Sequence, residues 1–142
     1  MCRELLPKAT THQRYPGPVL LSVGHLIPRK GYEELFAIYR EVIRVRPEIT
    51  LLIAGDGPCR RAYERFIRSE HWSRVVFLGH VHEQELPRYL ALADLFVFPT
   101  RYDAYGLVLA EAMAAGLPVV SSLHAAATQD LVEEGVTGFA MN

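Results

Sequence analysis

Short apolar runs alternate along this chain with segments in which apolar residues recur at helical spacing. Each run is continuous rather than alternating with polar residues, as expected for strands that are buried on both faces of a parallel sheet. Gly, Asp, Pro or Ser lies near the end of each run, and these residues suit the turn from a strand into a helix. The pattern predicts strands at residues 19–24, 50–57, 75–79, 95–100 and 118–122.

The segments between these runs are typical of helices. In residues 31–47, apolar side chains from Leu35 to Ile43 fall on one face, and Pro47 ends the pattern. Further helices are expected at 59–72, at 83–93, after Gly106, and from 127 to a cap at Gly135, before a sixth strand at 138–140. Strands and helices that alternate with short connections predict an α/β fold, a right-handed, doubly wound parallel sheet.

The chain has 142 residues, which is enough for one domain with a substantial core. Residues 19–142 carry the strand and helix pattern and are expected to form that domain. Residues 1–18 hold three prolines and no apolar period, so we expect a linker or tail there. The sequence stops at Asn142, inside or just after the last predicted strand, and no closing helix is expected.

Composition adds little that is specific. Half of the residues are hydrophobic, and the formal net charge is −1, so no overall field favours nucleic acid or an anionic membrane as a partner. Cys2 and Cys59 cannot form a disulfide framework, which favours a reducing compartment. No apolar run is long enough to span a membrane and no signal-peptide core is present, so we expect a cytoplasmic protein.

One carboxylate stands out in the segment "DAYGLVLAEAMAAGLPVV" at residues 103–120. Glu111 has apolar neighbours on every side of the predicted helix, and a helix that is apolar all round is normally buried. A buried, unpaired carboxylate costs several kcal/mol. We therefore expect Glu111 either to reach the surface or to hold a particular ligand.

Two loops at strand ends could bind an anion, because ligands of open α/β sheets bind outside the carboxyl ends of the strands. In the loop "GHLIPRKG" at residues 24–31, Arg29 and Lys30 fall where a helix begins. This loop is neither a Walker A loop nor a GxGxxG fingerprint, and a solvated basic pair explains it equally well. In the loop before Gly106, Asp103 is either a ligand-binding carboxylate or a helix N-cap.

The order of these segments and their amino-acid sequences resemble those of a known family. The stretches "SVGHLIPRKGYEEL", "LLIAGDGP", "VVFLGHV", "ELPRYLALADLFVFPTRYDAYGLVLAEAMAAGLPVV" and "EEGVTG" are similar to the carboxy-terminal half of retaining GT-B glycosyltransferases, the group 1 glycosyl transferases. The resemblance covers residues 19–142. It implies a Rossmann-like domain that binds a nucleotide-diphosphate sugar as donor substrate, with no metal or other cofactor. It also implies an amino-terminal acceptor-binding domain, which is missing from this chain.

The resemblance also implies roles for individual residues. Lys30 matches the lysine that pairs with the donor diphosphate, and His25, next to Gly24, takes the place of an arginine for the same phosphates. Asp103 and Glu111 match a pair of acids with seven residues between them. Asp103 would address the donor sugar and Glu111 would accept bonds from the ribose hydroxyls. The remaining expected contacts are backbone at Ala104, Tyr105, Gly106 and Leu107 for the diphosphate and sugar, and Gly79, His80 and Val81 near the base.

Three departures from the family pattern weaken the resemblance at the residues expected near the donor sugar and its diphosphate. Asp103 replaces a glutamate and is shorter by one C–C bond, roughly 1.5 Å. His25 offers at most one charge where arginine gives a permanent two-pronged donor. Ala126 and Ala127 replace two glycines before a third acid, Asp130. The chain is therefore expected to be the donor-binding domain of a transferase and inactive alone. The alternatives are a non-catalytic module of the same fold and an epimerase-like enzyme.

Other chemistries fit less well. His80 and His82, with His71 or His124, lack a carboxylate or cysteine at ligand spacing, so no metal site is expected. Cys59 opens a predicted helix, where a reactive or an idle thiol is possible. Ser121 and Ser122 are not part of a GxSxG elbow, which disfavours a hydrolase. Tyr102 and Tyr105 flank Asp103 and could either stack on a sugar or pack in the fold.

Overall fold

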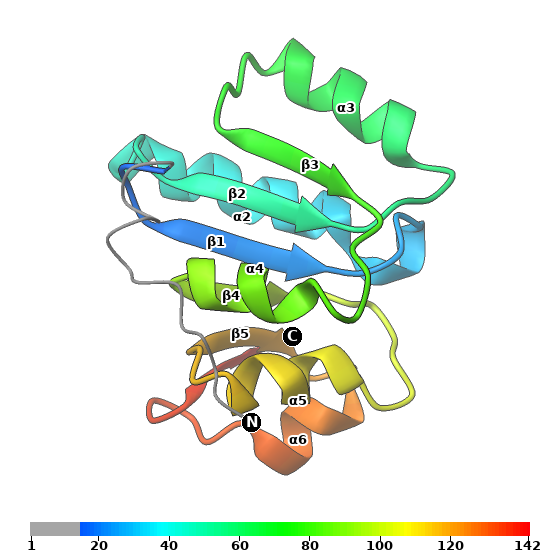
Figure 1. Ribbon diagram of the computed structural model, residues 1–142, viewed down its shortest axis with the longest axis vertical. Helices are drawn as coiled ribbons and strands as arrows, with labels where there is room; N and C mark the ends of the chain where they lie inside the picture. Colours follow the sequence, from blue (N-terminus) through cyan, green and yellow to red (C-terminus); the bar gives the residue numbers. More distant parts are fainter. Residues whose placement is uncertain (1–14) are drawn as a thin grey trace.

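A single six-stranded parallel sheet organises the chain (Figure 1). The computed structural model describes residues 15–142; residues 1–14, most of the predicted tail, lie outside the described part. The strands are β1 (Val19–Val23), β2 (Thr50–Ala54), β3 (Val75–Gly79), β4 (Leu95–Phe98), β5 (Val119–Ser122) and β6 (Gly138–Met141). Their order in the sheet is β3-β2-β1-β4-β5-β6. The predicted doubly wound fold is confirmed.

The strand order creates a switch point between β1 and β4. The chain first builds outward from β1 through β2 to β3, and then returns to place β4 on the other side of β1, where Leu20 pairs with Leu95 and Leu21 with Phe96. The loops that follow β1 and β4 therefore leave the sheet in opposite directions from adjacent strand ends. In open α/β sheets this is the crevice in which ligands bind.

Helices cover both faces of the sheet. They are η1 (Pro28–Lys30, a short 3-10 helix), α2 (Tyr32–Val45), α3 (Arg60–Ser69), α4 (Leu86–Leu92), α5 (Leu107–Ala114) and α6 (Ala126–Leu131). One buried cluster joins α2 and α3 to the sheet, for example through Phe36 and Tyr63 against Ile53. A second cluster joins α4 and α5 to the opposite face, for example through Leu90 and Leu109. Alternate strand residues thus serve two cores, as their continuous apolar runs require.

Two expectations about helices are wrong. Gly135 is not a helix cap, because α6 already ends at Leu131; Gly135 instead lies in the turn before β6, where its N–H donates to Gly138. The helix α5 is not buried on all sides either. Only Leu109 and Ala112 of α5 are buried, and Leu107 is 70% exposed, because α5 lies on one face of the sheet with its outer side uncovered.

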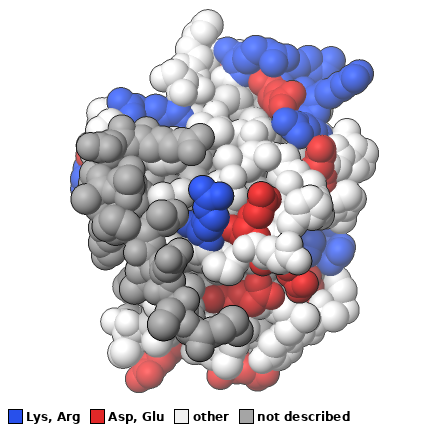
Figure 2. Space-filling model, in the orientation of Figure 1, with Lys and Arg blue, Asp and Glu red and all other residues white. Residues whose placement is uncertain are grey.

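Charge is strongly segregated over the molecule. Arginines gather over α3 at one end, whereas acidic side chains occupy the opposite end, around α5, α6 and β6 (Figure 2). After Arg101 the sequence contains no Lys or Arg, but it contains five acids: Asp103, Glu111, Asp130, Glu133 and Glu134.

None of the helices within residues 15–142 combines the length and apolar character that crossing a bilayer requires.

Candidate functional site

The loops after β1 and β4 are locked together at the switch point. Gly31, between η1 and α2, has a φ of 75°, and a Cβ at this position would lie 2.0 Å from the carbonyl oxygen of Pro99. Only glycine accommodates both the left-handed backbone and this close approach. The Arg101 N–H donates to the Arg29 carbonyl at 2.8 Å, which adds a direct backbone link. The side chains of the two loops are consequently held in a fixed relation.

This packing brings Lys30 and Asp103 together. The Lys30 Nζ donates to both carboxylate oxygens of Asp103, at 2.9 and 3.0 Å. Both side chains are largely shielded, with 17% and 15% of their surface exposed. The N-cap interpretation of Asp103 is wrong, because Gly106 occupies the N-cap of α5 and no side chain caps that helix.

Thr100 fixes the orientation of the Asp103 carboxylate. Its hydroxyl lies 2.8 Å from Asp103 Oδ2, and it is also 2.9 Å from the carbonyl of Tyr102 and 3.2 Å from that of Arg29. A hydroxyl has one proton, so it can donate fully to only one of these three acceptors. Thr100 is 1% exposed, and water cannot easily replace it there. The carboxylate is thus held from two sides, by an ammonium and by a buried hydroxyl.

Arg29 adds a second positive charge at the rim. Its Nη1 donates to the Tyr102 carbonyl at 2.8 Å and lies 3.9 Å from Asp103 Oδ1. The Arg29 side chain is 47% exposed, so solvent screens its attraction for the carboxylate. The basic loop therefore presents one shielded cation and one exposed cation beside the same acid.

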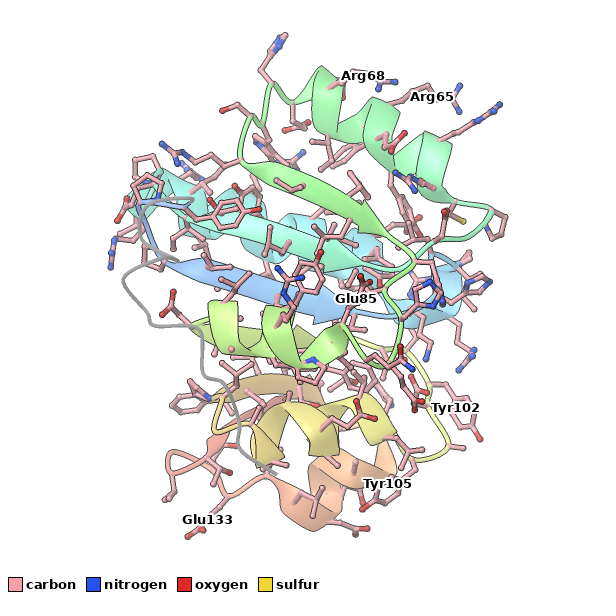
Figure 3. The ribbon with its side chains drawn as sticks, viewed as in Figure 1. Arg65, Arg68, Glu85, Tyr102, Tyr105 and Glu133 are labelled. Atoms are coloured by element: carbon pink, nitrogen blue, oxygen red, sulfur yellow. The ribbon has the colours of Figure 1, made fainter. Side chains whose placement is uncertain are left out.

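The start of α5 lies at the end of the β4 loop. The first N–H groups of a helix have no partner within the helix and favour an anion. The Tyr105 carbonyl accepts from Ala127 N at 2.8 Å, which ties this loop to the start of α6. Ala104, Tyr105 and Leu107 are exposed around this point, and Figure 3 shows Tyr102 and Tyr105 directed outward on the same side of the molecule. Both rings thus have accessible surface.

Glu111 reaches the surface. It lies in the second turn of α5 and is exposed, and its carboxylate has no hydrogen bond or ion pair with any residue of the described chain. The apolar neighbours that suggested burial either pack beneath it or are themselves exposed. Glu111 therefore avoids the cost of burial and keeps a free carboxylate.

A hollow of about 450 Å³ lies at the ends of β1, β2 and β3. Gly24, His25, His80 and Val81, four of the predicted donor-binding residues, line it together with Val23, Ala54, Gly55, Asp56 and Gly57. Gly79 lies one residue before this lining, at the end of β3. A Cβ on Gly24 would lie 3.6 Å from Lys30 Cδ, so the lysine stem borders the hollow. Asp103 and Glu111 are not part of its wall.

Asp56 also lines the hollow, although the sequence patterns did not indicate it as a site residue. Its carboxylate accepts from Gly57 N at 2.8 Å and from Arg60 Nη1 at 3.1 Å. The Gly57 hydrogen bond, followed by Arg60, lowers the pKa of Asp56. The signal that could have identified Asp56 is the "GDGP" sequence directly after β2, a polar side chain between two small residues at a strand end.

Metal and thiol chemistry receive no structural support. Within residues 15–142, no three His, Cys, Asp or Glu side chains lie where they would hold one metal ion. His80 and His82 do approach each other, with ring centroids 5.0 Å apart, but edge to face. Cys59 is partly buried at the N-cap of α3.

Comparison with known proteins identifies a match over nearly the whole chain. The family described as glycosyl transferases group 1 matches residues 17–142. Alpha-D-kanosaminyltransferase of Streptomyces kanamyceticus is 31% identical over 135 residues, which cover 92% of this chain and 35% of that protein. This chain thus spans about a third of that relative's length.

Solved structures show the same architecture. HepE of Anabaena, determined in complex with UDP and glucose, has a TM-score of 0.79 and 25% identity, covering 100% of this chain and 39% of HepE. The C-terminal domain of LpcC, a group 1 family protein of Francisella tularensis, has a TM-score of 0.81 over 96% of this chain and 75% of that chain. At 17% identity, LpcC supports the fold alone.

Proposed function

Because this chain belongs to the group 1 glycosyl transferases, we propose that its strand-end site binds a nucleotide-diphosphate sugar. The chain would serve as the donor-binding part of a longer enzyme that moves the sugar to an acceptor hydroxyl with retention of anomeric configuration. The relative Streptomyces transferase and HepE, which was solved with UDP and glucose, support this assignment. The observation that carries it is the Lys30–Asp103 pair at the switch point, between the hollow and the start of α5.

The donor diphosphate would bind between Lys30 and the N-terminus of α5. Lys30 offers three N–H donors, and the two Asp103 oxygens do not use all of them. The helix N-terminus adds unpaired backbone donors and the positive end of a dipole. His25, which lines the hollow, would contribute a further N–H donor.

The nucleoside would occupy the hollow and its rim. The hollow of about 450 Å³ falls in the size range of small-molecule sites. Gly55 and Gly57 shape its wall, because a Cβ on either would meet the backbone of Gly24 or Leu26. His80 and Val81 would contact the base. The exposed carboxylate of Glu111 would accept hydrogen bonds from the ribose hydroxyls, which an apolar residue on α5 could not do.

Sugar transfer would use these same groups. As the bond between the sugar and the diphosphate breaks, negative charge grows on the leaving diphosphate, and Lys30 with the α5 N-terminus would stabilise it electrostatically. Asp103 would orient the sugar through an oxygen shared with Lys30. The acceptor site would come from residues outside this chain, so we expect the 142-residue chain alone to bind the donor without transferring its sugar.

Calorimetric titration of the chain with UDP-, GDP- and ADP-glucose tests this proposal. We expect saturable binding of at least one of them, and we expect Lys30→Met to weaken it about tenfold or more, because a hydrogen bond to a charged group is worth roughly 1.5–3 kcal/mol. An Arg44→Gln change on α2 provides a control of equal charge and is expected to have no effect. Absence of binding to any NDP-sugar, or equal affinity in Lys30→Met, would contradict the proposal.

A second candidate is a nucleotide-sugar-binding module that does not catalyse transfer. The specific observation in its favour is that Lys30, the proposed phosphate ligand, is already paired with the shortened acid Asp103. Restoring Asp103→Glu and His25→Arg in a chain that includes the acceptor domain separates the two candidates. A large gain in transfer rate indicates a weakened enzyme, and unchanged inactivity indicates a binding module.

A further inference from the structure

Three arginines form a row along the outer side of α3. Arg61, Arg65 and Arg68 follow the i, i+4, i+7 spacing that places side chains on one helix face, over roughly 10 Å of helix. All three are exposed, and none forms an ion pair with a described residue. Arg60 on the same helix differs, because it is bound to Asp56 and Glu64. Figure 3 shows Arg65 and Arg68 directed away from the protein.

A second hollow borders this row. It measures about 620 Å³ and lies between α3 and the edge strand β3, with walls that include Ile67, Trp72, Val75 and Phe77. Arg68 and His71 also line it. The hollow involves the beginning of β3, whereas the proposed donor site lies at the ends of β1 to β3, and the two share no lining residue.

The charge distribution gives the molecule a preferred orientation near an anionic surface. The α3 helix carries four arginines and one glutamate, while residues 102–142 carry five acids and no Lys or Arg. An anionic surface would attract the α3 end and repel the opposite end, as Figure 2 indicates. The net charge of −1 conceals this separation.

We infer that the row Arg61, Arg65 and Arg68, together with the adjoining hollow, docks on a membrane surface that contains anionic phospholipid. Planar guanidinium groups bind phosphate through two parallel hydrogen bonds, which suits lipid headgroups. The apolar walls beside the cationic row favour an amphiphile, because an acyl segment can occupy the hollow while its phosphate stays on the arginines. A purely polar polyanion would use the arginines but would leave the apolar walls unoccupied.

The chain carries a built-in probe for this docking. Trp72 is its only tryptophan and lies in the wall of the hollow. Lipid that enters the hollow would place the indole in a less polar environment and shift its emission to shorter wavelengths. We expect this shift with vesicles of phosphatidylcholine containing about 25% phosphatidylglycerol, whose surface attracts arginines. Vesicles of pure phosphatidylcholine, inorganic phosphate and a single-stranded RNA oligomer should not produce it.

Vesicle co-sedimentation with matched variants completes the test. Each arginine near an anionic surface contributes roughly 1 kcal/mol, so R61Q/R65Q/R68Q should lower the partition coefficient by about a hundredfold. The control R44Q/R46Q/R88Q removes the same charge from exposed positions outside α3 and should lower it no more than about fivefold, the effect of one such contact. Equal losses in the two variants, no sedimentation with anionic vesicles, or preferential binding of the RNA would each overturn the inference.

Discussion

The Lys30 Nζ lies 2.9 and 3.0 Å from the two carboxylate oxygens of Asp103, although the two residues are 73 positions apart in the sequence. The pair spans the switch point, since Lys30 follows β1 and Asp103 follows β4. Asp103 is therefore both a partner that positions the ammonium and a competitor for any anion that approaches it. The proposed donor diphosphate must share Lys30 with this carboxylate.

Asp103→Asn tests the competition. The amide keeps the shape of the side chain but removes the negative charge beside Lys30, so affinity for the preferred nucleoside diphosphate should rise by up to about tenfold, the worth of one charged hydrogen bond. Calorimetry with UDP, GDP and ADP measures it. If Asp103→Asn instead weakens binding as much as Lys30→Met does, Asp103 acts by holding the lysine in place and the competition is absent.

Thr100→Val tests the buried hydroxyl that orients Asp103. The change keeps the volume but removes the donor 2.8 Å from Asp103 Oδ2, so the free energy of unfolding should fall by about 1 kcal/mol. Urea denaturation measures this loss. Thr100→Ser retains the hydroxyl and should therefore bind NDP-sugar with higher affinity than Thr100→Val. Equal NDP-sugar affinity in the two variants would show that the hydroxyl does not position the carboxylate for the donor.

Glu111→Gln tests the ribose contact. Because Glu111 is exposed, stability should stay within roughly 0.5 kcal/mol of the wild type. NDP-sugar binding should weaken by about tenfold, since hydrogen bonds to a charged group are lost, and the preference for ribose over deoxyribose nucleotides should decrease. Glu133→Gln, which changes an exposed carboxylate between α6 and β6, is the matched control and should change neither quantity. If Glu111→Gln keeps the full preference for ribose, Glu111 does not contact the ribose hydroxyls.

Gly31→Ala tests the lock between the two loops. The added Cβ would meet the Pro99 carbonyl oxygen at 2.0 Å on a left-handed backbone. Gly116 also has a positive φ, but a Cβ there meets nothing within 4 Å, so Gly116→Ala isolates the backbone strain of about 1–2 kcal/mol. Gly31→Ala should be clearly less stable than Gly116→Ala in urea denaturation. If both variants lose the same free energy of unfolding, the loops after β1 and β4 can move apart to admit the Cβ without further destabilisation.

Tyr63→Phe tests how the free energy of unfolding depends on pH between 10 and 12. Burial, followed by the neighbouring Cys59, raises the pKa of Tyr63 from 10.0 to about 12. A group whose pKa is raised on folding stabilises the protein below its unfolded pKa, and this contribution is lost as the pH rises from 10 toward 12. The Tyr63 hydroxyl has no hydrogen-bond partner among the described residues, so Tyr63→Phe should cost little at neutral pH and should reduce the alkaline loss. Urea midpoints across this pH interval check it, and an unchanged alkaline slope would contradict it.

Most of the fold could be predicted because its signals are local. The strands are continuous apolar runs, and β3, for example, occupies the predicted residues 75–79. The environment of α5 could not be predicted, because an apolar sequence does not reveal whether a neighbouring layer covers the helix. Leu107, for example, is 70% exposed within this apolar segment.

The site was predictable only in part. Strand-end loops indicated which edge would carry Lys30 and Asp103, but their direct pairing depends on β1 lying next to β4, and strand and helix alternation does not fix strand order. Asp56 also lines the hollow at the ends of β1 to β3. Its "GDGP" context marks the end of a strand but does not show that this strand end shares a hollow with those of β1 and β3. The separation of the arginines of α3 from the acids that follow Arg101 could not be recognised from the net charge, which is −1.

The most direct test of the account is a ¹⁵N–¹H NMR titration of the chain with the nucleoside diphosphate that binds best. We expect amide shifts to change at Gly24, His25, Lys30 and His80 and along the start of α5, and to stay constant at the arginine row of α3. Changes confined to other surfaces, or none at saturating nucleotide, would contradict the claim that these strand ends form a nucleotide-sugar site.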